Sequence, residues 1–165
     1  MPPANADIEG LLRALGQADV RFVVIGGVSA ALQGVPAVTY DLDVVLDPDP
    51  ENLDRAHAAL MALDACFREH LPNKRLVPQR DQLESAGAML LVTRLGPLDV
   101  LGRVATGWRY GDLLERSRAL SLADGLELKI LDLASLIRIK EAVDRDKDRA
   151  VLPLYRRTLE ERSEP

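Results

Sequence analysis

Apolar residues change their spacing several times along the chain, and each spacing predicts an element. Intervals of three and four residues over 7–16 predict a helix that Gly16 ends. The β-branched apolar run over 20–25 instead predicts a short buried strand, which ends at a pair of glycines. The elements expected next are a short helix over 28–33, an extended connector at Val35-Pro36, a strand over 41–46 and a helix after the turn over 47–50.

The second half of the chain predicts two strand hairpins. The segments 88–93 and 98–101 are apolar and are separated by Arg94-Leu95-Gly96-Pro97, which is typical of a turn. Further along, leucines alternate with polar or small residues on both sides of Asp124-Gly125. Because such a dipeptide favours a tight turn between strands, this region predicts a second hairpin.

The last third of the chain is predicted to be helical. Asp132 would cap a helix that runs to about Val143, and a final helix with a bend at Pro153 would follow. The polar segment 68–87 has no clear period and predicts a loop with at most one short strand. Since no repeat or linker interrupts the pattern, we expect a single domain over 1–165, with a core at about 7–130 and C-terminal helices at about 131–162.

Composition and charge exclude several classes of protein. Hydrophobic residues make up 47% of the chain and aromatic residues only 4%, so Leu, Val and Ala must fill the core. The net charge of -5 argues against a broad basic surface for nucleic acid, although a local basic site stays open. A single cysteine, Cys66, excludes an internal disulfide and a cysteine zinc cluster. With no signal-peptide pattern and no long apolar run, a cytoplasmic protein without a membrane span is expected.

Two carboxylates, Asp41 and Asp43, open the strand predicted over 41–46. Residues i and i+2 of a strand share a face, roughly 6.5–7 Å apart, so both side chains could converge on one or two divalent cations. Oxygen ligands of this kind suit Mg²⁺ or Mn²⁺. The alternative is an exposed strand start where Asp41 caps a turn. The acidic stretch 47–54 contains two prolines and is interpreted as a turn and a helix cap, not as a further metal site.

The glycine pair Gly26-Gly27 lies between the first predicted strand and the short helix. Without a Cβ, backbone N–H groups can approach a ligand closely, and the start of a helix favours an anion such as phosphate. Ser29 would lie in the first turn, where its hydroxyl could donate to a phosphate oxygen. A simple tight turn is the alternative. The chain carries neither the P-loop motif nor the dinucleotide-binding motif.

Asp99 is a third candidate, because it is an acid inside the apolar run 98–101. A carboxylate in a half-buried strand is costly unless it is paired or bound to a metal, although an edge-strand acid could also face water. Together, the glycine turn, Asp41, Asp43 and Asp99 would supply a phosphate site and three metal-binding carboxylates.

Four segments, in this order, carry a resemblance to a known family: "GGVSAALQG", "TYDLD", "GPLDVLG" and "LIRIKEAVDRDKD". The chain resembles the nucleotidyltransferase superfamily related to DNA polymerase β from about Val20 to about Leu159. More narrowly, it resembles the small bacterial proteins that include the AbiEii-type toxins. The resemblance implies an α/β (α+β) nucleotidyltransferase fold, with a short mixed β-sheet flanked by helices and a helical C-terminal segment.

The resemblance also implies roles for individual residues. Gly26, Gly27 and Ser29 would hold a triphosphate. Asp41 and Asp43 would hold Mg²⁺ (or Mn²⁺), while Asp99 would complete the metal site and help to deprotonate the acceptor. The reaction would transfer a nucleoside monophosphate from an NTP to a hydroxyl group of a tRNA, a protein or a small molecule. A cognate antitoxin or toxin protein would be a further partner.

Lys140 lies on the apolar stripe of its predicted helix, four residues after Leu136. Its stem could cover the core while its ammonium group reaches water, or, as the resemblance implies, the ammonium group could reach the triphosphate or a site carboxylate. Arg145, a candidate nucleotide-binding residue, follows in the family's pattern together with Lys147 and Asp148. A solvated helix face is the alternative for this charged run.

One position departs from the family pattern: Ala37 stands where related proteins usually carry an arginine. This departure keeps a catalytically inactive nucleotide-binding or protein-interaction module as the alternative to an enzyme. A further alternative is an antibiotic nucleotidyltransferase that modifies an aminoglycoside or a lincosamide.

Overall fold

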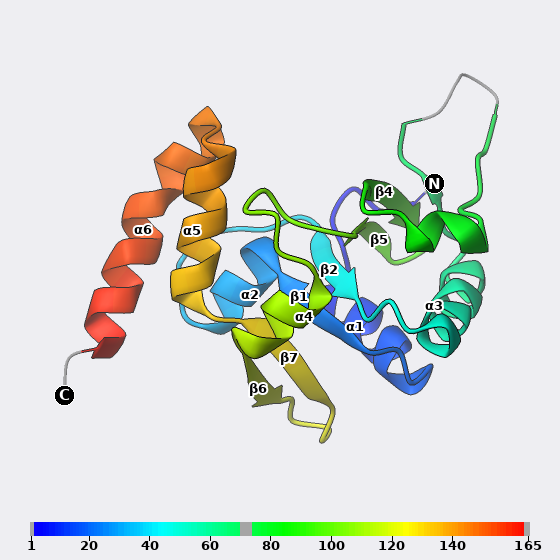
Figure 1. Ribbon diagram of the computed structural model, residues 1–165, viewed down its shortest axis with the longest axis horizontal. Coiled ribbons are helices and arrows are strands. Elements are labelled where there is room, and N and C mark those ends of the chain that lie inside the picture. The colour runs from blue at the N-terminus through cyan, green and yellow to red at the C-terminus, as the bar shows by residue number, and fades with distance from the viewer. Residues whose placement is uncertain (1, 70–73, 164–165) are drawn as a thin grey trace.

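The computed structural model describes residues 2–69 and 74–163, and one mixed sheet runs through them (Figure 1). The strand order is β3-β4-β5-β2-β1-β7-β6. The strands are β1 (Phe22–Ile25), β2 (Leu42–Leu46), β3 (Cys66–Phe67), β4 (Ala88–Thr93), β5 (Gly96–Leu101), β6 (Ser117–Ser121) and β7 (Glu127–Leu131). The helices are α1 (Ile8–Gln17), α2 (Gly26–Leu32), α3 (Pro50–Ala62), the short 3₁₀ turn η1 (Arg80–Glu84), α4 (Tyr110–Glu115), α5 (Leu133–Val143) and α6 (Asp146–Ser163).

Helices cover both faces of the sheet, and each face has its own apolar core. On one face, buried leucines of α1 and α3 pack against Val24 and Val44. On the other face, buried residues of α4, α5 and α6 pack against Val23 and Val45. Because successive residues of a strand point to opposite faces, the apolar runs of β1 and β2 supply both cores at once. The predicted α/β architecture with a mixed sheet and a helical C-terminal segment is confirmed.

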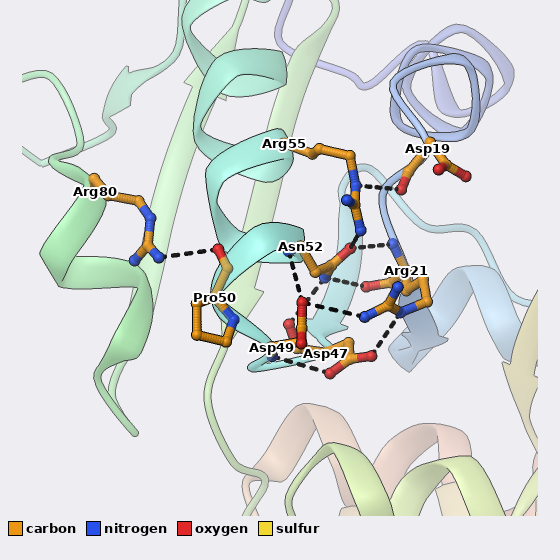
Figure 2. A network of polar contacts seen from close by, with 8 residues as sticks. All are labelled: Asp19, Arg21, Asp47, Asp49, Pro50, Asn52, Arg55 and Arg80. Carbon is orange, nitrogen blue, oxygen red and sulfur yellow. Dashed lines mark hydrogen bonds and ion pairs between the residues drawn. The ribbon is translucent and has the colours of Figure 1, made fainter.

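The central strands have the register that places the site. β2 pairs antiparallel with β1, and Ile25 lies opposite Asp43. β2 also pairs parallel with β5, and Asp43 lies opposite Asp99. The far end of the β1–β2 pair is closed by Asn52 at the start of α3, whose fully buried side chain bonds to the backbone of Arg21 (Figure 2).

Side-chain caps set the starts of three helices. Asp7, Asp49 and Asp132 each accept a hydrogen bond from a backbone N–H in the first turn of the helix that follows. The prediction that Asp132 caps a helix and the interpretation of the acidic stretch 47–54 as a turn and cap are therefore confirmed. In the latter, Asp47 and Asp49 also contact Arg21 (Figure 2).

Several details of the expected elements were wrong. α2 begins at Gly26, not at position 28, so the glycines belong to the helix. β5 begins at Gly96, which leaves only Arg94-Leu95 as the turn of the first hairpin. Neither α4 nor η1 was predicted, because both are too short to show a helical period. Residues 70–73 of the predicted loop 68–87 lie outside the described residues. Among the described helices, none has the length and apolarity that crossing a membrane requires.

Candidate active site

Three carboxylates converge where β2 and β5 lie side by side. Asp41 directly precedes β2, Asp43 is the second residue of β2, and Asp99 lies opposite Asp43 on β5. One oxygen from each of the three carboxylates lies within 4.8 Å of the other two. The parallel pairing of the strands therefore brings together the three acids that the sequence singled out. Such a cluster of oxygen ligands suits a hard divalent cation.

Burial and mutual repulsion perturb this cluster. Burial raises the pKa of Asp43 to about 7, and the neighbouring charges of Asp41 and Asp99 add to the effect. The cations of Lys140 and Arg68 act in the opposite direction. Burial likewise raises the pKa of Asp99 to about 6, against the attraction of Arg68. Without a cation, the cluster therefore keeps part of its protons near neutral pH.

Gly26 permits the close approach of the chain to this cluster. Its φ is +65°, and a Cβ at this position would lie 2.2 Å from Oδ2 of Asp43. A Cβ at Gly27 would lie 2.8 Å from Oγ1 of Thr39. The Thr39 hydroxyl in turn donates to the carbonyl oxygen of Asp41. The side chains of Asp43 and Thr39 thus occupy the space that a Cβ at position 26 or 27 would need. This is a second reason for the two glycines, besides the close approach of a phosphate that the sequence predicts.

Ser29 does not lie in the site. Its side chain is fully buried, and its hydroxyl donates to the carbonyl oxygen of Leu131 at the end of β7. Gln33, which directly follows α2, donates to the same carbonyl oxygen. The expectation that Ser29 donates to a phosphate is therefore not met. Ser29 therefore fastens α2 to the sheet, while Gly26 and Gly27 lie against the side chains of Asp43 and Thr39.

A cleft of about 650 Å³ contains the carboxylate cluster and most of the other candidate residues. It lies between the loop that follows α2, the end of β5 and the helical pair α5–α6. The candidates that line it are Gly26, Gly27, Asp41, Asp43, Asp99, Lys140, Arg145, Lys147 and Asp148.

Lys140 and Arg145 are held by one buried carboxylate. Nζ of Lys140 lies 3.1 Å from Oδ1 of Asp148, and Nε of Arg145 lies 2.7 Å from Oδ2 of the same group. Only 2% of the Asp148 side chain is exposed. Burial alone would raise the pKa of this carboxyl, but the two cations outweigh it and lower the pKa. Nζ of Lys140 also lies 5.2 Å from the ring centre of Tyr155.

Arg68 and Tyr155 join the site although the sequence did not single them out. Nη2 of Arg68 lies 2.5 Å from Oδ1 of Asp99, just after the short edge strand β3. Burial, together with the charges of Asp148 and Asp43, raises the pKa of Tyr155 to about 12. Arg68 lies in a polar segment without period, so nothing in the sequence indicated it. Tyr155 was visible only as an apolar position of the last helix.

Ala37 lines the cleft, where its methyl group packs against the second core. It supplies no charge. The guanidinium groups of the cleft come from other segments instead, since Arg103 after β5 and Arg145 before α6 both line it.

Comparison with known proteins identifies the fold. No protein-family model and no curated protein matches the chain. A solved structure of a "putative nucleotidyltransferase" from Thermotoga maritima superposes with a TM-score of 0.54, at 19% identity over 93% of this chain and 91% of the other. The antibiotic-resistance factor ANT(2'')-Ia superposes with a TM-score of 0.53, at 15% identity over 92% of this chain and 80% of the other. The chain has the nucleotidyltransferase fold.

The nucleotidyltransferase fold is the one that the four sequence segments implied, and that part of the resemblance is confirmed. The narrower likeness to AbiEii-type toxins stays a prediction.

Proposed function

We propose that this protein is a Mg²⁺-dependent (or Mn²⁺-dependent) nucleotidyltransferase that transfers a nucleoside monophosphate from an NTP to a hydroxyl group. The observation that carries the proposal is the convergence of Asp41, Asp43 and Asp99 beside the Gly26 turn, inside a cleft that cations surround. Phosphoryl transfer depends on positioning and on charge stabilisation, so a site of carboxylates and cations needs no histidine. The nucleotidyltransferase fold of the chain agrees with this chemistry.

The carboxylates fit a divalent cation in number, kind and electrostatics. One oxygen of each carboxylate lies within 4.8 Å of the other two, and the raised pKa of Asp43 marks a cluster of negative charge that a cation would relieve. Asp41, Asp43 and Asp99 would hold the metal. When bound, it would offset the charge on the phosphates and lower the pKa of the attacking hydroxyl.

The remaining groups would orient the nucleotide. Gly26 and Gly27 leave room for phosphate oxygens next to the backbone, because neither carries a Cβ. Lys140 and Arg145 would face the triphosphate, fixed by their shared contact with Asp148. Lys147, whose charge lowers the pKa of Asp99, would add a third cation on the same side of the cleft. Three cations would offset the negative charge that collects on the leaving pyrophosphate.

Asp99 would receive the proton of the acceptor. In the proposed step, the acceptor oxygen bonds to the α-phosphorus, the bond from that phosphorus to the bridging oxygen breaks, and pyrophosphate leaves. The hydroxyl proton moves to a carboxylate oxygen of Asp99, which would act as the general base. Arg68 orients this carboxylate from outside the cluster.

The test is transfer of label from an α-³²P-labelled NTP to cellular RNA, protein and small molecules in the presence of Mg²⁺. Asp41→Asn and Asp43→Asn should each reduce transfer at least about 100-fold, since removal of one electrostatic group already has an effect of this size. Arg157→Gln, at an exposed position of α6 that does not line the cleft, serves as the control and should transfer normally. Equal labelling by the wild type and both aspartate variants would contradict the proposal.

A second candidate is an antibiotic nucleotidyltransferase, and the observation that favours it is the similarity in fold to ANT(2'')-Ia. The third candidate is a non-catalytic module. It is favoured by Ala37, which stands where related proteins usually carry an arginine. Calorimetry with each NTP, with and without Mg²⁺, separates a metal-dependent nucleotide site from a protein-interaction module, because such a module would bind no NTP.

Toxin–antitoxin membership belongs to the proposal only through the resemblance to AbiEii-type proteins. Two exposed apolar residues at the cleft, Val38 (79% exposed) and Tyr40 (58% exposed), offer a contact for an acceptor or for an antitoxin. Induced expression of the wild type should then arrest growth, and Asp43→Asn should not. Unimpaired growth in both cases would remove this part of the proposal.

A further inference from the structure

The hydroxyl group of Tyr155 is buried in the cleft without a hydrogen-bond partner among residues 2–69 and 74–163. Only 2% of the residue is exposed, and it lines the cleft that holds the three carboxylates. Buried hydroxyl groups elsewhere do have partners, since those of Thr93 and Thr158 each donate to a backbone carbonyl oxygen. Because a buried phenol normally finds a partner, this hydroxyl is available to a ligand in the cleft.

The packing of α6 fixes Tyr155 in this position. It lies about two helical turns after Asp148, so both side chains project from the same face of the helix. The Tyr155 ring belongs to the second apolar core, together with Leu136 of α5 and Leu152 of α6. A side chain fixed by core packing loses little conformational entropy when a ligand binds to it.

The phenol of Tyr155 can act only as a neutral donor. Burial raises the pKa of Tyr155 to about 12, and the negative charges of Asp148 and Asp43 add to the effect. The hydroxyl therefore keeps its proton near neutral pH. It can donate a hydrogen bond to an anionic oxygen, but it cannot serve as a base.

The face of the same ring supports Lys140. Nζ of Lys140 lies 5.2 Å from the ring centre and 3.1 Å from Oδ1 of Asp148. An aromatic face attracts a cation, most strongly where water is excluded. The ammonium group is thus held from two sides, and because it has three N–H donors it keeps one available for a ligand.

We infer that Tyr155 binds the phosphate chain of the nucleotide: its hydroxyl donates to a phosphate oxygen, and its ring positions the ammonium group of Lys140 against the same chain. The inference rests on the proposed function and adds a residue to the nucleotide site. A phosphate oxygen is favoured as the acceptor because Lys140, which contacts the ring, would attract phosphate to it, and hydrogen bonds to charged oxygens are the stronger ones.

The first test compares Tyr155→Phe with the wild type in calorimetric binding of inorganic tripolyphosphate and of each NTP, with Mg²⁺ present. Loss of a hydrogen bond to a charged group should weaken binding of both probes about tenfold or more. Where transfer is measured, KM should rise while kcat stays unchanged, because the contact forms before the reaction. Tyr110→Phe makes the same change at a tyrosine that lines a separate cavity and should bind both probes as the wild type does.

Urea unfolding without nucleotide distinguishes a ligand contact from a structural one. Tyr155→Phe keeps the ring and removes a hydroxyl that bonds to nothing in the described part of the chain. The unfolding midpoint of this variant should therefore equal that of the wild type or lie above it. A lower midpoint would show that the hydroxyl stabilises the protein itself, and the inference would be wrong.

Tyr155→Leu tests the role of the ring. It should bind tripolyphosphate about threefold more weakly than Tyr155→Phe, or weaker still, because Lys140 loses the aromatic face. In the background of Lys140→Met, the same step from Phe to Leu should change binding by less than about twofold, since no ammonium group is left to hold. An equal loss in both backgrounds would contradict the role assigned to the ring. If Tyr155→Leu fails to fold, Tyr155→Phe still tests the hydroxyl.

The outcomes separate this inference from the proposed function. If Tyr155→Phe binds tripolyphosphate as tightly as the wild type does, the inference fails, while metal-dependent transfer still supports the proposed function. If the variant binds NTPs more weakly but tripolyphosphate equally, the hydroxyl contacts the ribose or the base, and the assignment to phosphate is wrong. A wild type that binds no NTP in the presence of Mg²⁺ would refute the proposed function and the inference with it.

Discussion

A Cβ atom on Gly26 would lie 2.2 Å from Oδ2 of Asp43, so the two residues can occupy their places only if position 26 is glycine. This close approach lies between the first residue of α2 and the central carboxylate of the site. A glycine pair after a strand commonly indicates phosphate binding. Here the glycine at position 26 also leaves the space that the metal-binding side chain of Asp43 occupies.

Gly26→Ala should therefore inactivate the protein without unfolding it. The new methyl group would displace the Asp43 carboxylate, and the φ of +65° would add roughly 1–2 kcal/mol of strain. We expect transfer to fall at least about 100-fold and Mn²⁺ affinity, measured by calorimetry, to fall at least about tenfold.

Gly111→Ala is the matched control for this variant. Gly111 lies in α4, where a Cβ would meet no atom within 4 Å, so alanine should be neutral or stabilising by up to about 1 kcal/mol. If Gly26→Ala binds Mn²⁺ as tightly as Gly111→Ala does, the steric argument is wrong.

Asp43 should give the metal-free protein a characteristic dependence of stability on pH. Its pKa in the folded state is about 7, above the value of 3.8 for an ordinary aspartate. The folded protein therefore keeps a proton that the unfolded chain releases, and the free energy of unfolding falls as pH rises from about 4 to about 7. The contribution of Asp43 should be roughly 2–4 kcal/mol over this range.

Asp43→Asn removes this titration and tests the prediction. In urea unfolding without metal, the variant should be more stable than the wild type at about pH 8, and its stability should decline less between about pH 4 and pH 7. Added Mn²⁺ should stabilise the wild type alone, by about 2.7 kcal/mol at a concentration 100-fold above its Kd. Identical pH profiles for the two proteins would show that burial of Asp43 has no such effect.

The sequence predicted the carboxylate site better than its surroundings, and the reason is physical. Asp41, Asp43 and Asp99 interrupt apolar strands, where an acid is conspicuous, and the parallel pairing of β2 with β5 then brings them together. Arg68 lies in a segment without period. Its position depends on how the chain after β3 folds back on the sheet, so only the structure reveals it.

Ser29 is the reverse case, a residue that the sequence placed in the site and the structure places outside it. Its place after two glycines suggested a phosphate ligand, but the direction of a side chain depends on where the helix begins. α2 begins at Gly26, and this start turns Ser29 toward Leu131 in the core. The predicted helix began two residues too late, an error that sequence patterns do not resolve. With the correct start, the Ser29 hydroxyl points to the sheet and not into the cleft.

Asn52 should be essential for stability and dispensable for chemistry. Its fully buried amide accepts from the backbone N–H of Arg21 and donates to the carbonyl oxygens of Arg21 and Asp47, beyond the paired ends of β1 and β2 (Figure 2). Asn52→Ala removes all three hydrogen bonds, and only the carbonyl oxygen of Arg21 keeps another, from the N–H of Asp47, so the free energy of unfolding should fall by about 1–3 kcal/mol.

The control for Asn52→Ala is Gln17→Ala at the exposed end of α1, which should change stability by less than about 0.5 kcal/mol. Transfer per folded molecule should be unchanged in both variants, since Arg21 and Asp47 lie at the ends of the strands away from Asp43. A stability loss no larger than that of Gln17→Ala would contradict the role assigned to the amide.

Asp148→Asn should weaken NTP binding, which depends on the orientation of Lys140 and Arg145, without weakening metal binding. The variant keeps the size of the side chain but removes the charge that holds Lys140 and Arg145. Loss of one partner from a fully buried ion pair lowers the free energy of unfolding by about 3–5 kcal/mol. Because the Arg145 side chain is 58% exposed, a loss of about 2 kcal/mol is expected here.

Without the Asp148 charge to hold Lys140 and Arg145, the cleft should bind NTP about tenfold more weakly, which raises KM. The affinity for Mn²⁺ should stay within about twofold, because Asp41, Asp43 and Asp99 are unchanged. Asp146→Asn, at an exposed carboxylate that pairs with Arg149, is the matched control; it should leave KM unchanged and alter stability by less than about 1 kcal/mol. A variant that loses Mn²⁺ binding together with NTP binding would place Asp148 among the metal-binding groups, and the positioning role would be wrong.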